Sequence, residues 1–175
     1  MANASIEPVL NNAACEEVLQ DTFTGTLVMC HENTPYAVPL NHAFVDGRFY
    51  FHCGLRGRKI DMIKQNPNVV YVVNKLQSAP DQMPQDRRCH GPWQSLVAYG
   101  TARVVEDNDE KAAAFKAFMG QYGVPDYQMT EQALTQTSGI IIEVSSMTVR
   151  SELVRGQNEY WLWLPAEEAE ADARQ

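Results

Sequence analysis

Three basic residues, Arg56, Arg58 and Lys59, lie around two glycines where a strand-like run gives way to a helix-like run. Backbone N–H groups at a helix start, with fixed cations beside them, suit a phosphate group. The chain as a whole carries a formal net charge of -8, so the basic loop is a local reversal of charge. The pattern predicts an anion site at residues 54–59, although the same residues also suit a solvated helix start.

Three of the four cysteines stand next to a histidine, as Cys30-His31, His52-Cys53 and Cys89-His90. Neighbours in a strand point to opposite faces, so one pair does not easily give both ligands to one ion. The spacing typical of zinc sites is missing. No metal site is predicted, and no disulfide framework is expected in a reducing compartment. Cys53, beside the basic loop, is a candidate for a lowered thiol pKa and for reaction with oxidants.

The elements that must position the loop follow from apolar periodicity and turn residues. Asp46-Gly47 is a hairpin signal, Asn66-Pro67 ends a helix, and Asp107 caps the next one. Residues 77–92 contain three prolines and predict a long loop. Helices are predicted at residues 11–20, 57–65 and 107–122, and strands at 25–31, 36–45, 48–52, 68–76, 93–106 (bent at Gly100) and 138–150.

Six short strands joined by hairpins, with helices inserted between them, predict a mainly β fold: a six-stranded antiparallel barrel of Greek-key type. There is no G-x-G-x-x-G or Walker A sequence. Residues 1–165 are predicted to form one domain, and the acidic residues 166–175 a disordered tail. Residues 159–164 are too apolar to be free, so we expect them to pack on the barrel or on a partner chain.

Composition limits the function. A net charge of -8 argues against a general nucleic-acid binder, which needs a broad basic face. No apolar run approaches the roughly 20 residues that span a bilayer. The N-terminus lacks the basic and apolar stretches of a secretory signal, so we expect a cytoplasmic protein.

Several short motifs, taken in order, resemble those of the FMN-binding split-barrel superfamily of pyridoxamine 5'-phosphate oxidases, and most closely the nitroimidazole-resistance (Nim-type) proteins. The resemblance covers roughly residues 20–150, and no single motif is diagnostic. The motifs are Val38-Pro39-Leu40-Asn41, Phe49-Tyr50-Phe51-His52, Gly57-Arg58-Lys59, Asn66-Pro67 with Val69, Trp93-Gln94-Ser95 leading to Gly100-Thr101-Ala102, Glu106-Asp107, and Lys111.

The resemblance implies FMN as the cofactor and gives each matching residue a role. Arg58 and Lys59 match the cations that hold the flavin phosphate, and His52 and Cys53 match positions that face the phosphate and ribityl chain. A strand whose backbone lies along the isoalloxazine ring is matched by Pro39, Leu40 and Asn41.

A further segment of such proteins reaches the flavin, usually across a dimer interface, and is matched by Trp93, Gln94 and Ser95. The resemblance therefore implies a homodimer with the cofactor at the interface. The duller alternatives stay open: His52 as a structural histidine, Trp93 as packing, and Tyr36 as a plain strand former.

The chain also departs from authentic pyridoxamine phosphate oxidases. Tyr36 and Asn41 stand where those enzymes have Arg and Lys, and the C-terminal Arg-Leu-His element is absent. These departures argue against vitamin B6 oxidation. The expectation is an FMN-dependent oxidoreductase acting on a small organic molecule, with nitro-group reduction as one reaction and His52 as the catalytic residue.

Two alternatives share the fold. One is a non-enzymatic flavin- or haem-binding protein for sensing, storage or electron carriage, with His31, His42, His52 and His90 as candidate axial ligands. The other is a vestigial site, or one that takes a deazaflavin.

Overall fold

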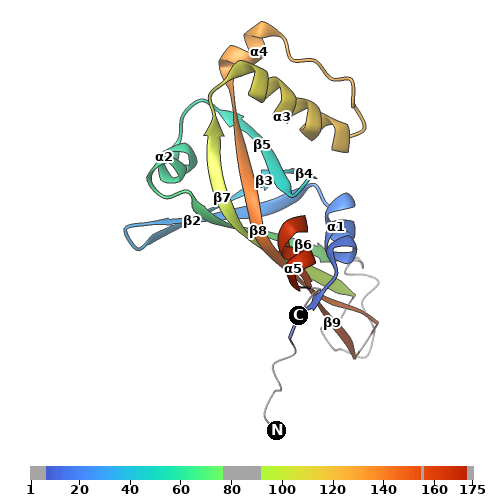
Figure 1. Ribbon diagram of the computed structural model, residues 1–175. Helices are drawn as coiled ribbons and strands as arrows, with labels where there is room; N and C mark the ends of the chain where they lie inside the picture. Colours follow the sequence, from blue (N-terminus) through green and yellow to red (C-terminus); the bar gives the residue numbers. More distant parts are fainter. Residues whose placement is uncertain (1–6, 77–91, 155, 173–175) are drawn as a thin grey trace, which may run out of the picture.

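The computed structural model describes residues 7–76, 92–154 and 156–172 (Figure 1). Within these ranges the elements, in chain order, are β1 (Val9–Leu10), α1 (Asn12–Gln20), β2 (Thr24–His31), β3 (Thr34–Asn41), β4 (Ala43–Val45), β5 (Arg48–Gly54), α2 (Arg58–Gln65), β6 (Asn68–Leu76), β7 (Trp93–Val105), α3 (Asn108–Gln121), α4 (Glu131–Gln136), β8 (Thr137–Val154), β9 (Gln157–Trp163) and α5 (Ala166–Asp172).

One sheet forms the body of the described chain. Its strands follow the order β1-β9-β8-β7-β6-β2-β3, and the β4–β5 hairpin joins through a pairing of β5 with β8. Strand β8 is shared, since residues 137–143 pair with β5 and residues 147–154 pair with β9. The sheet, which is antiparallel except for the β1–β9 pair, therefore divides along β8 into a curled part and an extension, which confirms the predicted split-barrel class.

Two tight hairpins set the strand register near the basic loop. Glu32 (φ 48°) and Asn33 (φ 59°) form the turn between β2 and β3, and Asp46 (φ 49°) begins the turn between β4 and β5. Two-residue hairpins favour positive φ because that twist matches the twist of the strands. The hairpin predicted at Asp46-Gly47 is confirmed.

The core fills the inner face of the curled sheet. Phe49, Tyr71, Leu27, Leu96 and Ile140 are completely buried there. Helix α1 contributes Val18 and Leu19, and α2 contributes Ile60 and Ile63. Burial of a large apolar side chain contributes roughly 1.5–3 kcal/mol, so these inner faces hold the barrel together.

The structure corrects the sequence predictions in three places. The strand expected at residues 36–45 is interrupted at His42, whose N–H bonds to the Phe23 carbonyl at 3.0 Å. The described residues contain nine strands, three more than predicted, because the short β1, β4 and β9 join the sheet. Residues 166–172, expected to be disordered, form helix α5.

Other expectations are met. The bend predicted at Gly100 is a register shift between Tyr99 and Gly100, where β7 pairs with β8. The apolar segment 159–164 lies largely in β9 and packs on the barrel, with Trp163 in the core. The loop predicted at 77–92 and the tail end 173–175 fall almost wholly outside the described residues. No helix in the described part of the chain is long and apolar enough to cross a membrane.

Candidate functional site

Helix α2 begins without a side-chain cap. Its N-cap residue is Gly57, which has φ 139° and no side chain to accept a hydrogen bond from the first turn. The N–H of Ile60 bonds back to the Gly57 carbonyl at 2.9 Å, whereas the N–H groups of Arg58 and Lys59 have no acceptor among the described residues. A Cβ placed on Gly54 or Gly57 would meet nothing within 4 Å. The helix start therefore borders open space at these two glycines.

The cations around this helix start have no carboxylate partner among the described residues. Arg56 and Arg58 are exposed and Lys59 is half-buried. The ion pairs of the described chain are formed by other residues, and no carboxylate there pairs with these three. Positive charge in the first turn is unfavourable for the helix dipole. A bound phosphate would satisfy both the free N–H groups and the surplus charge.

Tyr36 brings strand β3 to this helix start. The guanidinium carbon of Arg58 lies 4.6 Å from the centre of the Tyr36 ring, which is the geometry of a cation–π contact. The Tyr36 ring is half-buried and packs against the core, so it is a firm support. The sequence suggested Tyr36 only as a strand former, and no local pattern could have paired it with Arg58.

The outer edge of β3 offers few hydrogen-bond donors. Within the described residues β3 pairs with β2 alone. The His42–Phe23 bond sets the alternation of the ladder, so residues 40, 38 and 36 direct their N–H groups toward β2 and residues 41, 39, 37 and 35 direct theirs outward. Pro35 and Pro39 have no N–H. Only Ala37 and Asn41 therefore present an N–H at this edge.

His52 and Cys53 end β5 on opposite faces of the strand. The His52 ring lies against helix α3, with ring centres 5.0 Å from Phe118 and 5.8 Å from Phe115. Burial, and then the charge of Lys59, lower the pKa of His52 below its ordinary value. His52 is therefore neutral at pH 7, and it remains exposed enough to meet a ligand.

Cys53 faces the core and is 9% exposed. Burial raises the pKa of the Cys53 thiol, and the smaller effect of Lys59 in the opposite direction does not cancel it. The suggestion of an activated thiolate at Cys53 is therefore wrong. A buried thiol of raised pKa is an unreactive core group.

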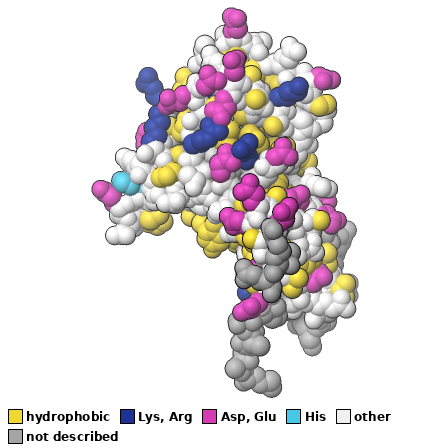
Figure 2. All heavy atoms as spheres, in the orientation of Figure 1, with side chains coloured by type: hydrophobic (Ala, Val, Ile, Leu, Met, Phe, Trp, Pro, Cys, Tyr) yellow, Lys and Arg dark blue, Asp and Glu magenta, His cyan; other side chains and the backbone are white. Residues whose placement is uncertain are grey.

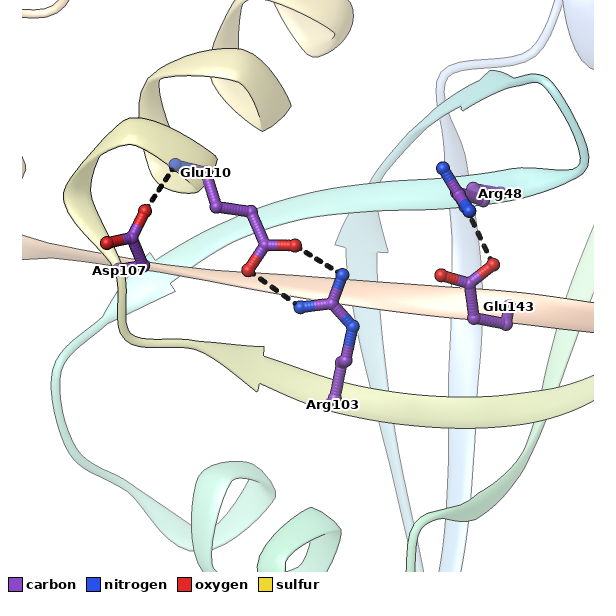
Figure 3. A network of polar contacts seen from close by, with 5 residues as sticks. All are labelled: Arg48, Arg103, Asp107, Glu110 and Glu143. Carbon is purple, nitrogen blue, oxygen red and sulfur yellow. Dashed lines mark hydrogen bonds and ion pairs between the residues drawn. The ribbon is translucent and has the colours of Figure 1, made fainter.

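Helix α3 is fixed over the sheet by polar contacts (Figure 3). Arg103 on β7 binds Glu110 through its two terminal guanidinium nitrogens, at 2.8 and 2.5 Å, and the Asp107 carboxylate caps the helix by accepting from Glu110 N–H. Arg48 and Glu143 pair nearby across β5 and β8 at 2.7 Å. Figure 2 shows basic and acidic side chains mixed on one face of the molecule. These contacts thus hold α3, the helix against which the His52 ring packs, in a fixed position.

Trp93, Gln94 and Ser95 lie at the other end of the β6–β7 ladder. Asn68, beside α2, pairs with Thr101, and Ser95 is six residues further back along β7, roughly 20 Å away. The Gln94 side chain faces inward and is 7% exposed, whereas Trp93 and Ser95 belong to the outer face. One chain therefore brings together β3, β5 and the α2 start, but it does not bring Trp93–Ser95 to them.

The outer face of β2, β6 and β7 is apolar and is only partly covered. Its side chains alternate with the buried ones and form two cross-strand rows. Tyr99 at the end of one row is 49% exposed. The rows are Val28–Val70–Tyr99 and Thr26–Val72–Val97.

The four histidines have different surroundings. His42 is completely buried, and its Nδ1 lies 2.9 Å from the hydroxyl of Tyr71, so it is not placed to reach a haem iron. His31 is half-buried near Glu32, and His90 is outside the described residues. His42 and Tyr71 were not among the predicted cofactor-binding residues, although His42 directly follows the motif that matches the ring-binding strand.

An antiparallel sheet divided along β8, with a basic helix start beside an unpaired strand edge, defines the split-barrel class. The family model described as pyridoxamine 5'-phosphate oxidase matches residues 11–151, and the chain belongs to this family. No curated protein matches the chain.

Solved structures of similar fold come from several bacteria. One is a candidate 5-nitroimidazole antibiotic resistance protein from Bacteroides thetaiotaomicron (22% identity, TM-score 0.67, covering 79% of this chain and 82% of that one). Another is a FAD-binding protein from Mesorhizobium loti (22% identity, TM-score 0.61, 81% and 95% covered). A third is a FAD and haem binding protein from Mycobacterium smegmatis (15% identity, TM-score 0.67, 93% and 78% covered). At these identities the likeness shows the fold alone.

Proposed function

We propose that this protein binds FMN and acts as an oxidoreductase on a small organic molecule. The observation that carries the proposal is the uncapped start of α2, where free N–H groups and three cations without carboxylate partners lie together. Arg58 and Lys59 would hold the phosphate, and the outward N–H groups of Ala37 and Asn41 would bind polar atoms of the ring. Bound flavin supplies electron transfer, which no side chain of the protein provides.

His52 is the residue that we assign to proton transfer. As a neutral imidazole it has a free lone pair that can take a proton, and the imidazolium formed in this way can give the proton back. Helix α3 holds its ring from behind through Phe118. The description of the B. thetaiotaomicron neighbour as a candidate 5-nitroimidazole resistance protein supports a nitro compound as the substrate.

The functional unit is proposed to be a homodimer with a shared site. The apolar rows on β2, β6 and β7 would be covered by a second copy, which explains why β-branched and aromatic side chains face outward there. The same face carries Trp93 and Ser95. A second copy could therefore supply these residues to a site that they do not reach within their own chain.

The cofactor proposal is tested with the purified protein. An absorption spectrum should show two flavin bands, and mass analysis after denaturation should identify FMN. The flavin-free protein should bind FMN more tightly than riboflavin by about 100-fold or more, because two charge-assisted bonds to the phosphate contribute about 1.5–3 kcal/mol each. Equal affinity for the two flavins would refute the phosphate site, and a Soret band would favour the haem-binding alternative.

The dimer is tested by light scattering at micromolar concentration. Val97→Arg, on the apolar face, should yield monomers that have lost most of their FMN. Val124→Arg is the matched control, because Val124 is 44% exposed and lies just beyond α3. A wild-type monomer that keeps its flavin would refute the shared site.

A further inference from the structure

A buried polar chain lies behind the peptide that joins Leu40 to Asn41. The Tyr71 hydroxyl donates to the Leu40 carbonyl at 2.9 Å, and His42 Nδ1 lies 2.9 Å from the same hydroxyl. Tyr71 and His42 are both completely buried. A Cβ on Gly25 would lie 2.6 Å from the Tyr71 ring, so glycine leaves the space that this ring needs.

The direction of each hydrogen bond follows from the acceptor. A carbonyl oxygen only accepts, so the Tyr71 proton goes to Leu40, and His42 must then donate to Tyr71 from Nδ1. His42 Nε2 is left as a lone pair with no hydrogen-bond partner in the described structure. A buried polar atom without a partner costs about 1–3 kcal/mol, which an aliphatic side chain would avoid. The core therefore retains an arrangement that lowers stability, and a role outside stability would explain it.

The chain acts on the outer edge of β3 through one peptide group. The described peptides are trans, so the Leu40 carbonyl and the Asn41 N–H point in opposite directions. The β2–β3 ladder directs the Asn41 N–H outward, and the Tyr71 hydroxyl holds the Leu40 carbonyl in the opposite direction. Donation to the carbonyl also polarises the peptide and strengthens its N–H as a donor. Because Pro39 has no N–H, Asn41 is the donor at this end of the strand.

We propose that His42 and Tyr71 are positioning residues that aim and strengthen the Asn41 N–H as a hydrogen-bond donor to the flavin ring, an inference that rests on the proposed function. Reduction places negative charge on the ring, and a donor at that point stabilises it. The two buried side chains thereby raise the reduction potential of the bound flavin, although neither touches it.

The experiment compares three variants. Tyr71→Phe keeps the ring and removes the hydroxyl, and His42→Leu removes the donor to that hydroxyl. Tyr122→Phe is the matched control, because its hydroxyl also bonds backbone carbonyls, those of Phe23 at 3.2 Å and His42 at 3.4 Å, but not that of Leu40. Two quantities are measured: the midpoint potential of bound FMN, and the amide proton shift of Asn41 in the flavin-free protein.

Tyr71→Phe should move the potential to more negative values and the Asn41 amide proton upfield, His42→Leu should do so by less, and Tyr122→Phe should change neither. A folded Tyr71→Phe protein with an unchanged potential would overturn the inference, and His42→Leu gives the same decision if Tyr71→Phe does not fold. Wild-type protein that binds no flavin would refute the proposed function. An unchanged Asn41 amide in flavin-free Tyr71→Phe would instead refute only the role of the two buried residues.

Discussion

Helices α2 and α3 begin in opposite ways. The start of α3 has the Asp107 cap, two acidic residues in the first turn, and Arg103 bound to Glu110. The start of α2 has a glycine at the N-cap, no side-chain cap, and two basic residues, Arg58 and Lys59, before Asp61, the one acidic residue of its first turn. Both helices follow a strand of the same sheet, so position in the fold does not explain the difference.

The contrast separates a helix start that is complete by itself from one that lacks a partner. At α3 Arg103 pairs with Glu110, the Asp107 carboxylate accepts the Glu110 N–H, and these contacts fix the helix behind His52. At α2 the free N–H groups and the cations have no such partners, so a bound anion would stabilise this helix start. We infer that α3 serves the scaffold and that α2 serves the ligand.

The largest effect should come from removing the two cations of α2. Arg58→Ala with Lys59→Ala should lower FMN affinity by about 100-fold or more, because each lost bond to the phosphate contributes about 1.5–3 kcal/mol. Flavin fluorescence titration measures the change, and riboflavin affinity should stay the same. Arg103→Ala is the control cation at α3. Comparable FMN loss in the control would remove the distinction between the two helix starts.

The buried His42 imidazole should affect the pH dependence of stability, whereas the free N–H groups at α2 should affect the binding of an anion. Burial lowers the pKa of His42 from 6.5 to about 4, so between these values the unfolded chain binds more protons than the folded one. The proton taken up by His42 in the unfolded chain should therefore lower the free energy of unfolding. The loss is absent above pH 6.5 and reaches about 3 kcal/mol as the pH drops to 4.

Urea unfolding of the wild type and of His42→Leu across this pH range isolates the effect of the one imidazole. The difference between their unfolding free energies should shift in favour of the variant as the pH falls. Parallel curves would show that His42 is not held neutral by burial.

Removing the cap of α3 should affect stability alone. Asp107→Ala should cost about 1 kcal/mol, as losses of N-caps typically do. For a chain of this size the melting temperature should fall by about 2–4 °C. FMN affinity should not change, since α3 retains the Arg103–Glu110 pair and the contact with His52. A large loss of FMN would mean that the α3 start belongs to the ligand site.

Much of the fold could be predicted because the signals are local. Asp46-Gly47 marked a hairpin, Asn66-Pro67 ended α2, and Gly100 marked a bend, since each acts through the backbone of a few residues. Helix α5 was missed because its acidic segment has few apolar residues to bury, and the local sequence does not indicate which contacts it makes with the rest of the chain. Strand β4 was not separated from β3, because the break at His42 depends on a bond to Phe23.

Only the part of the site formed by residues adjacent in the sequence could be predicted. The basic loop at 54–59 could be found because its glycines and cations are adjacent in the sequence. The stacking of Arg58 on Tyr36, the bond from Tyr71 to Leu40 and the inward side chain of Gln94 all depend on register between strands. The expected thiolate at Cys53 failed for a related reason, because burial on the inner face outweighs the nearby Lys59.

The smallest effect should come from phosphate alone. If α2 lacks only an anion, inorganic phosphate should stabilise the flavin-free protein by mass action, by about 0.4 kcal/mol at a concentration equal to its dissociation constant. The melting temperature should rise by about 1 °C.

Chloride at equal ionic strength controls for screening, and the Arg58→Ala, Lys59→Ala protein should not respond. Because the proposed phosphate site lies at α2 and not at α3, Asp107→Ala should leave the response to phosphate intact. A response that persists without Arg58 and Lys59 would place the anion elsewhere and end the contrast between the helices.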